Sequence, residues 1–489
     1  MSAFLRRRGL VFAAIIAVSV LMHLKGLGSP MLDYHHHRQC NTAAIARNYY
    51  ENGLHFFSPQ IDWEGAYRGR SATEFPLYMW LMGLLWPVFG LGDLWGRVLS
   101  IVFSALSAVT LFKFLERKME AEPAFYASLF FSCIPLEIYF GRTVQPEAIA
   151  LFGTVAAFYH WDKFLADKSW RDWALAILFS FLAIAHKLPY AYLLLPLAVL
   201  SGRQLKTSRV LIAPLLALAG VYAWYHYAAT SQIYVVPSRA SEFMGLLTYQ
   251  HLPRYISFQL LSRFPELACT YGGLILMGFG ALEWVRRRRE CRPQSRFFAA
   301  WFLFVAAGII AGGGYSFSHE YTSLPFALVN AAFMGMGFYR LRGRAVGARP
   351  WARAGLVLLA LSVPIHATLR ISHWYRLSHP FLKYARKAAD AVSRPDDLFV
   401  CNERASSVFL YYMHRRGWSW DLAEGGEEKF AMLPKRIDQG AKFYVTEKTP
   451  GFERREGLYA KFLYAHYPVV YDADDILIFR LRSSAPASP

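Results

Sequence analysis

Acidic and basic side chains that could carry out group transfer lie in short polar segments directly next to long apolar runs. Asp33 follows the apolar run 10–27, and Glu147 lies in the segment GRTVQPEA. A carboxylate in such a place can accept a proton from an acceptor hydroxyl or bind a divalent metal ion. Lys187, in AHKLPY, and Arg142 supply the positive charge that a lipid phosphate or pyrophosphate needs. The carboxylates and the cations together predict transfer of a sugar from a phosphate-linked carrier to a hydroxyl.

Several of these residues have simpler alternative roles. Glu74 is a further candidate carboxylate, but it could also be a solvated loop residue. The consecutive histidines 35–37 cannot all point one way, so we expect a contact from one of them rather than a three-histidine metal site. Lys187 could extend to the lipid headgroups, and Arg142 and Glu147 could pair only with each other. The other candidates for contacts with the phosphate, the acceptor or the loop are Arg38, His319, Tyr321, His35, His37 and Glu64.

The composition indicates a membrane protein. Of the 489 residues, 55% are hydrophobic and only 18% are charged, which is too little charge to cover the surface of a soluble protein of this size. The net charge of +19 comes mostly from short clusters between apolar runs, as in the cytoplasmic loops of membrane proteins. The sequence has no basic, aromatic-rich nucleic-acid module, and its five cysteines have no metal-binding spacing. We therefore expect membrane lipids as partners and no nucleic acid.

Apolar runs near the length that spans a bilayer recur along the chain. The basic clusters between them favour a cytoplasmic amino end and about eleven crossings, with the carboxyl end outside. The run 76–91 is ambiguous, and we place it along the outer surface because a crossing there would move the later basic clusters to the wrong side. The predicted crossings lie near residues 10–27, 95–115, 122–140, 146–165, 170–185, 188–201, 209–228, 268–285, 297–312, 322–339 and 353–369.

The composition changes in the last quarter of the chain. The segments DDLFVCNE, AKFYVTEK and DILIFRLR are typical of strands, with helical stretches near 406–415 and 457–466 between them. No GxGxxG or GxxxxGK loop occurs there, so we expect no nucleotide site. The predicted fold class is mainly α. A polytopic membrane helical bundle occupies residues 1–370, with an outer loop and juxtamembrane helices at 28–92, and an extracytoplasmic α/β domain follows at 371–489.

The order of these motifs resembles that of the GT-C membrane glycosyltransferases. The similarity rests on Asp33 soon after the first crossing, HHHRQCNTAAIARNYYENGLHFFSPQIDW, EFPLYMWLMGLLWPVFG, GRTVQPEA and HEYTSLP. It is closest to the bacterial protein O-mannosyltransferase and aminoarabinose-transferase group, which is like glycosyltransferase family 39. In that superfamily an acidic residue of the first outer loop is catalytic, and Asp33 matches it. A second acid in the next outer loop assists or binds metal, and Glu147 matches that one. The acidic-X-proline stretch matches Glu74, although Phe75 stands where aminoarabinose transferases have a basic residue.

The resemblance implies a polyprenyl phosphate sugar donor, such as undecaprenyl or dolichyl phosphate, and a periplasmic or extracytoplasmic active site. Lys187 would bind the phosphate, with Arg142 and His319 as further contacts. Asp33 would accept the acceptor proton in an inverting single displacement. Whether Asp33 and Glu147 bind a divalent metal (Mg²⁺, Mn²⁺ or Zn²⁺) stays open. The expected acceptor is a glycan, lipid or protein at the outer face of the cytoplasmic (inner) membrane.

Two other functions are compatible with the same residues. A flippase or transporter of lipid-linked sugars would place its site near the bilayer midplane between related halves, whereas the ionisable residues here gather at one mouth and no repeat is evident. An O-antigen polymerase or ligase would use a pyrophosphate-linked oligosaccharide. A glycosyltransferase that depends on a polyprenyl-phosphate sugar is the primary prediction.

Overall fold

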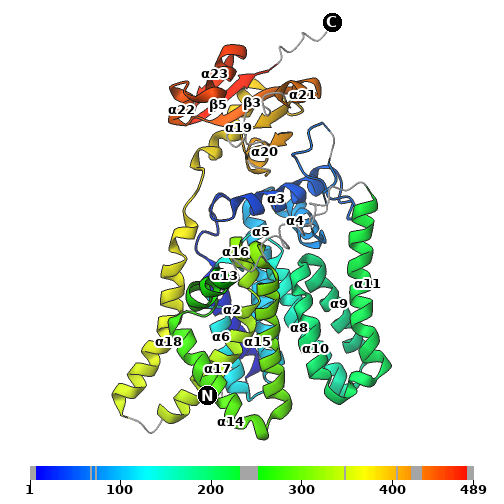
Figure 1. The fold of residues 1–489 in the computed structure, drawn as a ribbon, viewed down its shortest axis with the longest axis vertical. Helices are drawn as coiled ribbons and strands as arrows, with labels where there is room; N and C mark the ends of the chain where they lie inside the picture. Colours follow the sequence, from blue (N-terminus) through cyan, green and yellow to red (C-terminus); the bar gives the residue numbers. More distant parts are fainter. Residues whose placement is uncertain are drawn as a thin grey trace. The chain divides into compact units, whose positions relative to one another are not determined.

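The chain forms two compact units in a computed structural model (Figure 1). The structure describes residues 7–66, 69–71, 74–231, 252–345, 349–403, 406–419 and 432–481. Unit 1 comprises residues 1–27, 96–227 and 236–373, and unit 2 comprises residues 28–95, 228–235 and 374–489. The predicted division at residue 370 stays a prediction. Unit 2 groups the segment 28–95 with the C-terminal segment.

Unit 1 is built from helices (Figure 1). Its α-helices are α2 (Arg8–His23), most of α5 (Asp93–Leu115), α6 (Ala121–Phe131), α7 (Pro135–Phe140), α8 (Glu147–Asp167), α9 (Trp170–His186), α10 (Leu194–Ser201), α11 (Ser208–Thr230), α13 (Leu252–Phe258), α14 (Tyr271–Arg286), α15 (Arg292–Ala311), α16 (Gly313–Ser318), α17 (Phe326–Ala345) and α18 (Pro350–Arg370). Short 3-10 turns join several of them: η1 (Leu188–Leu193), η2 (Gly202–Lys206), η4 (Arg287–Arg289) and η5 (Glu320–Ser323). A π-helical turn, η3 (Gln259–Ala268), precedes α14. Each predicted crossing contains at least one of these helices.

Four helices of the described chain, α5, α11, α15 and α18, are long and apolar enough to cross a membrane by length and composition. A fifth candidate is the pair Leu252–Ala268 and Tyr271–Arg289, which bends by 99° at its break. Thr270, in that break, has a φ of 72°, which a threonine seldom adopts. The predicted count of eleven crossings stays a prediction.

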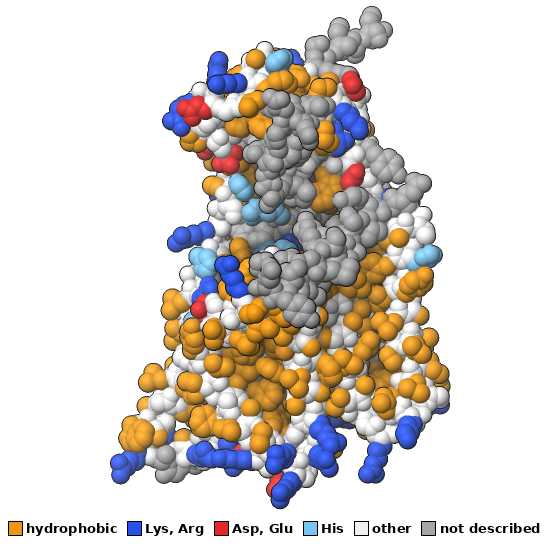
Figure 2. All heavy atoms as spheres, in the orientation of Figure 1, with side chains coloured by type: hydrophobic (Ala, Val, Ile, Leu, Met, Phe, Trp, Pro, Cys, Tyr) orange, Lys and Arg blue, Asp and Glu red, His pale blue; other side chains and the backbone are white. Residues whose placement is uncertain are grey.

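The surface of the unit 1 helices that points away from their core is strongly apolar. Figure 2 shows hydrophobic side chains across the helices and Lys and Arg side chains gathered at one end of them. On α11, Leu215 and Tyr222 are 64% and 70% exposed, and on α18 Leu358 is 67% exposed. So much apolar surface is unfavourable in water and requires an apolar surrounding such as lipid hydrocarbon.

Unit 2 contains the helices of the segment 28–95 and a small sheet. Its α-helices are α3 (His36–Glu51), α4 (Leu77–Phe89), α19 (Ala385–Val392), α20 (Val408–Met413), α21 (Met432–Asp438), α22 (Pro450–Glu453) and α23 (Gly457–His466), and η7 (Pro380–Tyr384) is a 3-10 turn. The turn η6 (Ser372–Tyr375) spans the boundary between the units. The 13-residue α4 covers about 20 Å, less than the roughly 30 Å of a bilayer core. Its length agrees with a position along the membrane surface.

The sheet has five strands in the order β2-β1-β3-β5-β4. They are β1 (Leu398–Cys401), β2 (Arg416–Ser419), β3 (Ala441–Glu447), β4 (Val469–Ala473) and β5 (Ile476–Arg480). The pairs β1/β2 and β1/β3 are parallel, whereas β3/β5 and β4/β5 are antiparallel. The three predicted strand segments coincide with β1, β3 and β5. Tyr444, Leu477 and Phe479 are buried in the core on one face of this sheet.

Buried hydrogen bonds tie the segment 28–95 to the C-terminal segment within unit 2. The Arg47 guanidinium donates to the Tyr411 carbonyl at 2.8 Å and to Asp62 Oδ2 at 2.7 Å. The hydroxyls of Tyr411 and Tyr412 donate to the Asp93 carboxylate at 2.8 and 3.2 Å. These hydrogen bonds restrict the conformation of the segment, because Arg47 and Asp93 are bound to residues far away in the sequence.

Candidate active site

A buried ion pair joins α8 to α9 in unit 1. Glu147 is the first residue of α8, where the helix dipole favours a carboxylate. Lys187 follows the last residue of α9 in an extended conformation, and Pro189 prevents the helix from continuing. Lys187 Nζ lies 2.7 Å from Glu147 Oε1, with side chains 10% and 1% exposed. The structure therefore brings together two of the residues that the sequence analysis selected.

Aromatic side chains adjoin this ion pair. Lys187 Nζ lies 5.1 Å from the centre of the Tyr321 ring, a cation–π distance. The His319 ring stacks on Tyr321 at 5.1 Å with an angle of 11° between the planes. The hydroxyls of Tyr321 and Tyr315 are 2.8 Å apart. Of the other predicted phosphate-binding residues, Tyr321 thus lies beside Lys187, and His319 stacks on Tyr321.

Two buried arginines of unit 1 are held by backbone carbonyls. Arg142 is fully buried, donates from Nη1 to the Gly26 carbonyl at 3.2 Å and lies over the Tyr139 ring. Arg263, on η3, donates to the carbonyls of Ser316 and Phe317, the latter at 2.7 Å. Arg142 is among the residues that the sequence pattern predicted, whereas Arg263 is not. A signal was present, because a cation at membrane depth is costly and usually functional.

A second buried carboxylate, Glu137 on α7, was not selected from the sequence. It is fully buried, and within the described chain neither of its side-chain oxygens accepts a hydrogen bond. The His23 ring lies beside it, with Nε2 3.0 Å from the Glu137 carbonyl and 3.7 Å from Oε1, and Nδ1 2.5 Å from the Ser19 carbonyl. These contacts place the His23 ring between the backbone of α2 and the Glu137 residue of α7.

Asp33 is buried in unit 2, just before α3. Its Oδ1 accepts a hydrogen bond from Gln39 Nε2 at 2.7 Å, which fixes the orientation of the carboxylate. Arg38 forms an ion pair with Glu74, the second candidate carboxylate of the loop. Glu74 is 7% exposed, so it is not the solvated loop residue of the alternative interpretation.

The other predicted loop residues of unit 2 lie in different surroundings. His35 has a φ of 60° and is the N-cap residue that precedes α3, and Nδ1 of His37 lies 3.5 Å from Glu403 Oε1. Glu64 packs beside Gly69, at a distance that leaves no room for a side chain there. Burial, with smaller contributions from His37 and His379, lowers the pKa of His36 to about 3. His36 is therefore neutral at neutral pH and adds no positive charge to this loop.

The residues do not form a recognisable metal centre. Within the part of the chain that the structure describes, no three His, Cys, Asp or Glu side chains gather closely enough to hold a metal ion. An oxygen of Glu147 is occupied by Lys187, and an oxygen of Asp33 by Gln39. We therefore derive no step through a metal, and the metal-binding role of Asp33 and Glu147 stays a prediction.

Comparisons with known proteins agree with this architecture. Residues 73–227 match the family model for dolichyl-phosphate-mannose-protein mannosyltransferase. A search of curated protein sequences gives no match. Among solved structures, ArnT from Cupriavidus metallidurans bound to undecaprenyl phosphate is 12% identical, with a TM-score of 0.60 over 96% of this chain and 98% of that one.

Two other solved structures are similar over nearly the whole chain. The oligosaccharyltransferase AglB from Archaeoglobus fulgidus, in complex with an inhibitory peptide and a dolichol-phosphate, is 12% identical, with a TM-score of 0.57 over 98% of this chain and 74% of that one. The arabinofuranosyltransferase AftD from Mycobacteria is 13% identical, with a TM-score of 0.59 over 97% of this chain and 40% of that one. The protein is thus a multi-pass membrane protein with the fold of the GT-C glycosyltransferases, and the resemblance to that superfamily is confirmed.

Proposed function

We propose that the protein is a glycosyltransferase that moves a sugar from a polyprenyl-phosphate donor to an acceptor hydroxyl. The observation that carries this proposal is the buried pair of Lys187 and Glu147 beside Tyr321, with Lys187 Nζ 2.7 Å from the carboxylate. Both residues of the pair lie in the segment that matches the mannosyltransferase family model. Solved structures of similar fold contain undecaprenyl phosphate and dolichol-phosphate.

In the proposed reaction, Lys187 and Arg142 bind the lipid phosphate, with His319, Tyr321 and Arg38 as further contacts. The bond between the anomeric carbon and the phosphate oxygen breaks, and the phosphate keeps the electron pair. These cations stabilise the negative charge that develops on the leaving phosphate. The acceptor oxygen attacks the opposite face of the anomeric carbon, so the configuration inverts.

The acceptor proton is transferred to Asp33, the general base of the proposal. Its buried carboxylate is oriented by Gln39 and can accept a proton through its remaining lone pairs. Glu147 and Glu74 hold cations in place, and His35, His37 and Glu64 are candidates for contacts with the acceptor or the loop. The proposal includes about eleven crossings of the inner membrane, with the amino end in the cytoplasm and the reaction on the outer face.

The test is a transfer assay with purified full-length protein, labelled undecaprenyl-phosphate sugars and envelope extract as the source of acceptors. We expect Lys187→Gln to lower transfer by about 10²–10³-fold, the effect of removing one donor that stabilises a developing charge. Asp33→Asn should lower transfer by about 10²–10⁴-fold. The matched control is Lys461→Gln, which changes an exposed lysine of α23 and should leave transfer unchanged.

Two results would overturn the proposal. The first is full transfer by Asp33→Asn at normal expression, because the assigned base would then be wrong. The second is movement of the lipid-linked sugar across proteoliposomes without any glycosidic product, which is the behaviour of a flippase.

A further inference from the structure

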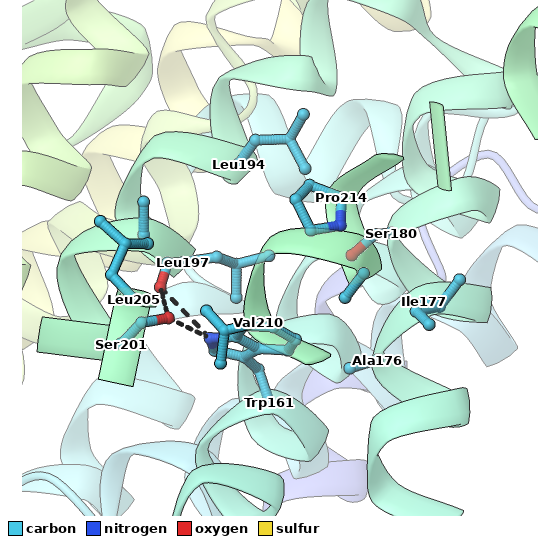
Figure 3. Close-up of a pocket in the computed structure, with 12 residues that line it drawn as sticks. Trp161, Ala176, Ile177, Ser180, Leu194, Leu197, Ser201, Leu205, Val210 and Pro214 are labelled. Carbon is cyan, nitrogen blue, oxygen red and sulfur yellow. Dashed lines mark hydrogen bonds between the residues drawn. The ribbon is translucent and has the colours of Figure 1, made fainter. Parts of the chain in front are cut away.

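An apolar crevice lies among α8, α9, α10 and α11 of unit 1 (Figure 3). Twelve residues line it, and only Ser180 and Ser201 among them carry a hydroxyl group. Trp161 Nε1 donates to Ser201 Oγ at 3.0 Å and to the Leu197 carbonyl at 3.2 Å, and Ser201 donates to the same carbonyl at 2.8 Å. These polar groups satisfy one another, so the walls of the crevice offer mainly hydrocarbon.

The crevice adjoins a face of α11 that is exposed to lipid. Val210, Ala213 and Pro214 of α11 line the crevice, whereas Leu211 and Leu215 of the same helix are 51% and 64% exposed. The acyl chains of the surrounding bilayer lipids are therefore the groups that adjoin this crevice.

Three exposed cations flank the same crevice. Arg203, Lys206 and Arg209 lie next to the lining residues Leu205 and Val210 in the chain. Throughout the described residues, none of these three cations forms an ion pair with a carboxylate. The positive charge at this end of the four helices is therefore available to an anionic group.

Lys168 and Trp170 lie close to the segment that carries these three cations. Lys168 Nζ donates to the Leu165 carbonyl at 2.7 Å and to the side chain of Gln204, which lies in η2 beside Arg203. The Arg209 guanidinium lies 4.4 Å from the centre of the Trp170 ring, and Trp170 is 59% exposed. An exposed indole beside cations is typical of the depth of lipid headgroups.

We propose that this place binds one anionic glycerophospholipid of the bilayer. Arg203, Lys206 and Arg209 bind its phosphate, and one acyl chain enters the crevice. Basic pockets between transmembrane helices bind anionic headgroups through charge, and the buried chain adds apolar contact. The site is independent of the proposed sugar transfer, because it uses none of the residues assigned to that reaction.

Native mass spectrometry of the purified full-length protein with added dioleoyl phosphatidylglycerol or dioleoyl phosphatidylcholine tests the proposal. We expect one phosphatidylglycerol per chain to be retained at concentrations where phosphatidylcholine is lost. The triple variant Arg203→Gln/Lys206→Gln/Arg209→Gln should weaken this binding by about 100-fold. The matched control Arg288→Gln/Arg289→Gln/Arg344→Gln removes the same charge elsewhere in the unit and should leave the binding unchanged.

A second set of variants tests the crevice itself. Ala176→Leu places a larger side chain in the crevice and should weaken binding by about tenfold with the cations intact. Ala174→Leu changes an exposed alanine of the same helix and is the matched control. If Ala176→Leu does not fold, Ala213→Val fills the crevice more gently.

Two results would overturn the proposal. They are equal retention of the two phospholipids, and unchanged binding in both the triple variant and the crevice variant.

Discussion

The buried guanidinium of Arg47 in unit 2 and the buried carboxylate of Glu137 in unit 1 have different surroundings. Arg47 donates to Asp62 and to the Tyr411 carbonyl, and Asn48 donates to the other oxygen of Asp62 at 2.8 Å. Glu137 accepts no hydrogen bond on either oxygen within the described chain, and its Oε1 lies 3.7 Å from Nε2 of His23. The Arg47 guanidinium belongs to a complete network, whereas the Glu137 carboxyl group does not.

This difference separates two uses of buried charge. A fully satisfied network fixes one conformation, so the Arg47 network is suited to holding the loop that carries Asp33. A charge with incomplete local partners costs stability and persists in natural proteins mainly where it has another use. The ion pair of Glu147 and Lys187 lies in the same unit as Glu137, and both of its side chains are buried as well. The comparison therefore predicts that removing a charge of the Arg47 network costs more stability than removing the carboxylate of Glu137.

The largest expected effect on stability is that of Arg47→Leu. It leaves the carboxylate of Asp62 buried without its cation, which costs about 3–5 kcal/mol. The double variant Arg47→Met/Asp62→Leu removes both charges and should recover most of that loss. Unfolding of the full-length protein in detergent, monitored by near-UV circular dichroism, measures both effects. If the two variants were equally unstable, the charge pair would not be what holds the loop.

A smaller loss is expected for Glu137→Gln. The amide keeps the shape of the side chain but brings an N–H donor into a fully buried place, so we expect a loss of about 1–2 kcal/mol. Sugar transfer should stay within about fivefold, since Glu137 has no assigned role in the reaction. Glu122→Gln, which changes a partly exposed partner of Arg342, is the control and should cost less than about 1 kcal/mol. A 100-fold loss of transfer would instead place Glu137 in the reaction.

The helices were largely predictable from the sequence, because apolar runs of bilayer length leave few alternatives. The bend of 99° after η3 was not, since it depends on Thr270 adopting a positive φ, which no local pattern favours. In the C-terminal segment, β2 and β4 were missed as strands. The sequence of β2, RGWS, is only four residues long. Its alternation of polar and apolar residues is too short to distinguish a strand from a turn.

The candidate site was predictable where a charge stands beside an apolar run. Glu147 and Lys187 were selected for that reason, and the structure pairs them. Arg263 was not selected, because its contacts with Ser316 and Phe317 depend on a fold that brings distant segments together. Glu137 stood inside the predicted crossing 122–140, where a single acidic residue should itself have been the signal.

The smallest expected effect concerns Asp397, a satisfied carboxylate of unit 2. Burial alone would raise its pKa, but Lys442 at 2.6 Å and the Arg394 backbone N–H at 2.8 Å outweigh burial and hold the pKa of Asp397 below its usual range. A depressed pKa stabilises the fold above the unfolded value of about 3.9, and this stability is lost as the pH falls through the folded value. Asp397→Asn should therefore cost about 1 kcal/mol at pH near 7, with a difference from the parent protein that shrinks toward about pH 3. Thermal unfolding of both proteins across this range measures it. A difference that did not change with pH would mean that the carboxylate is held by shape rather than by charge, and the contrast between the two units would then rest on Arg47 alone.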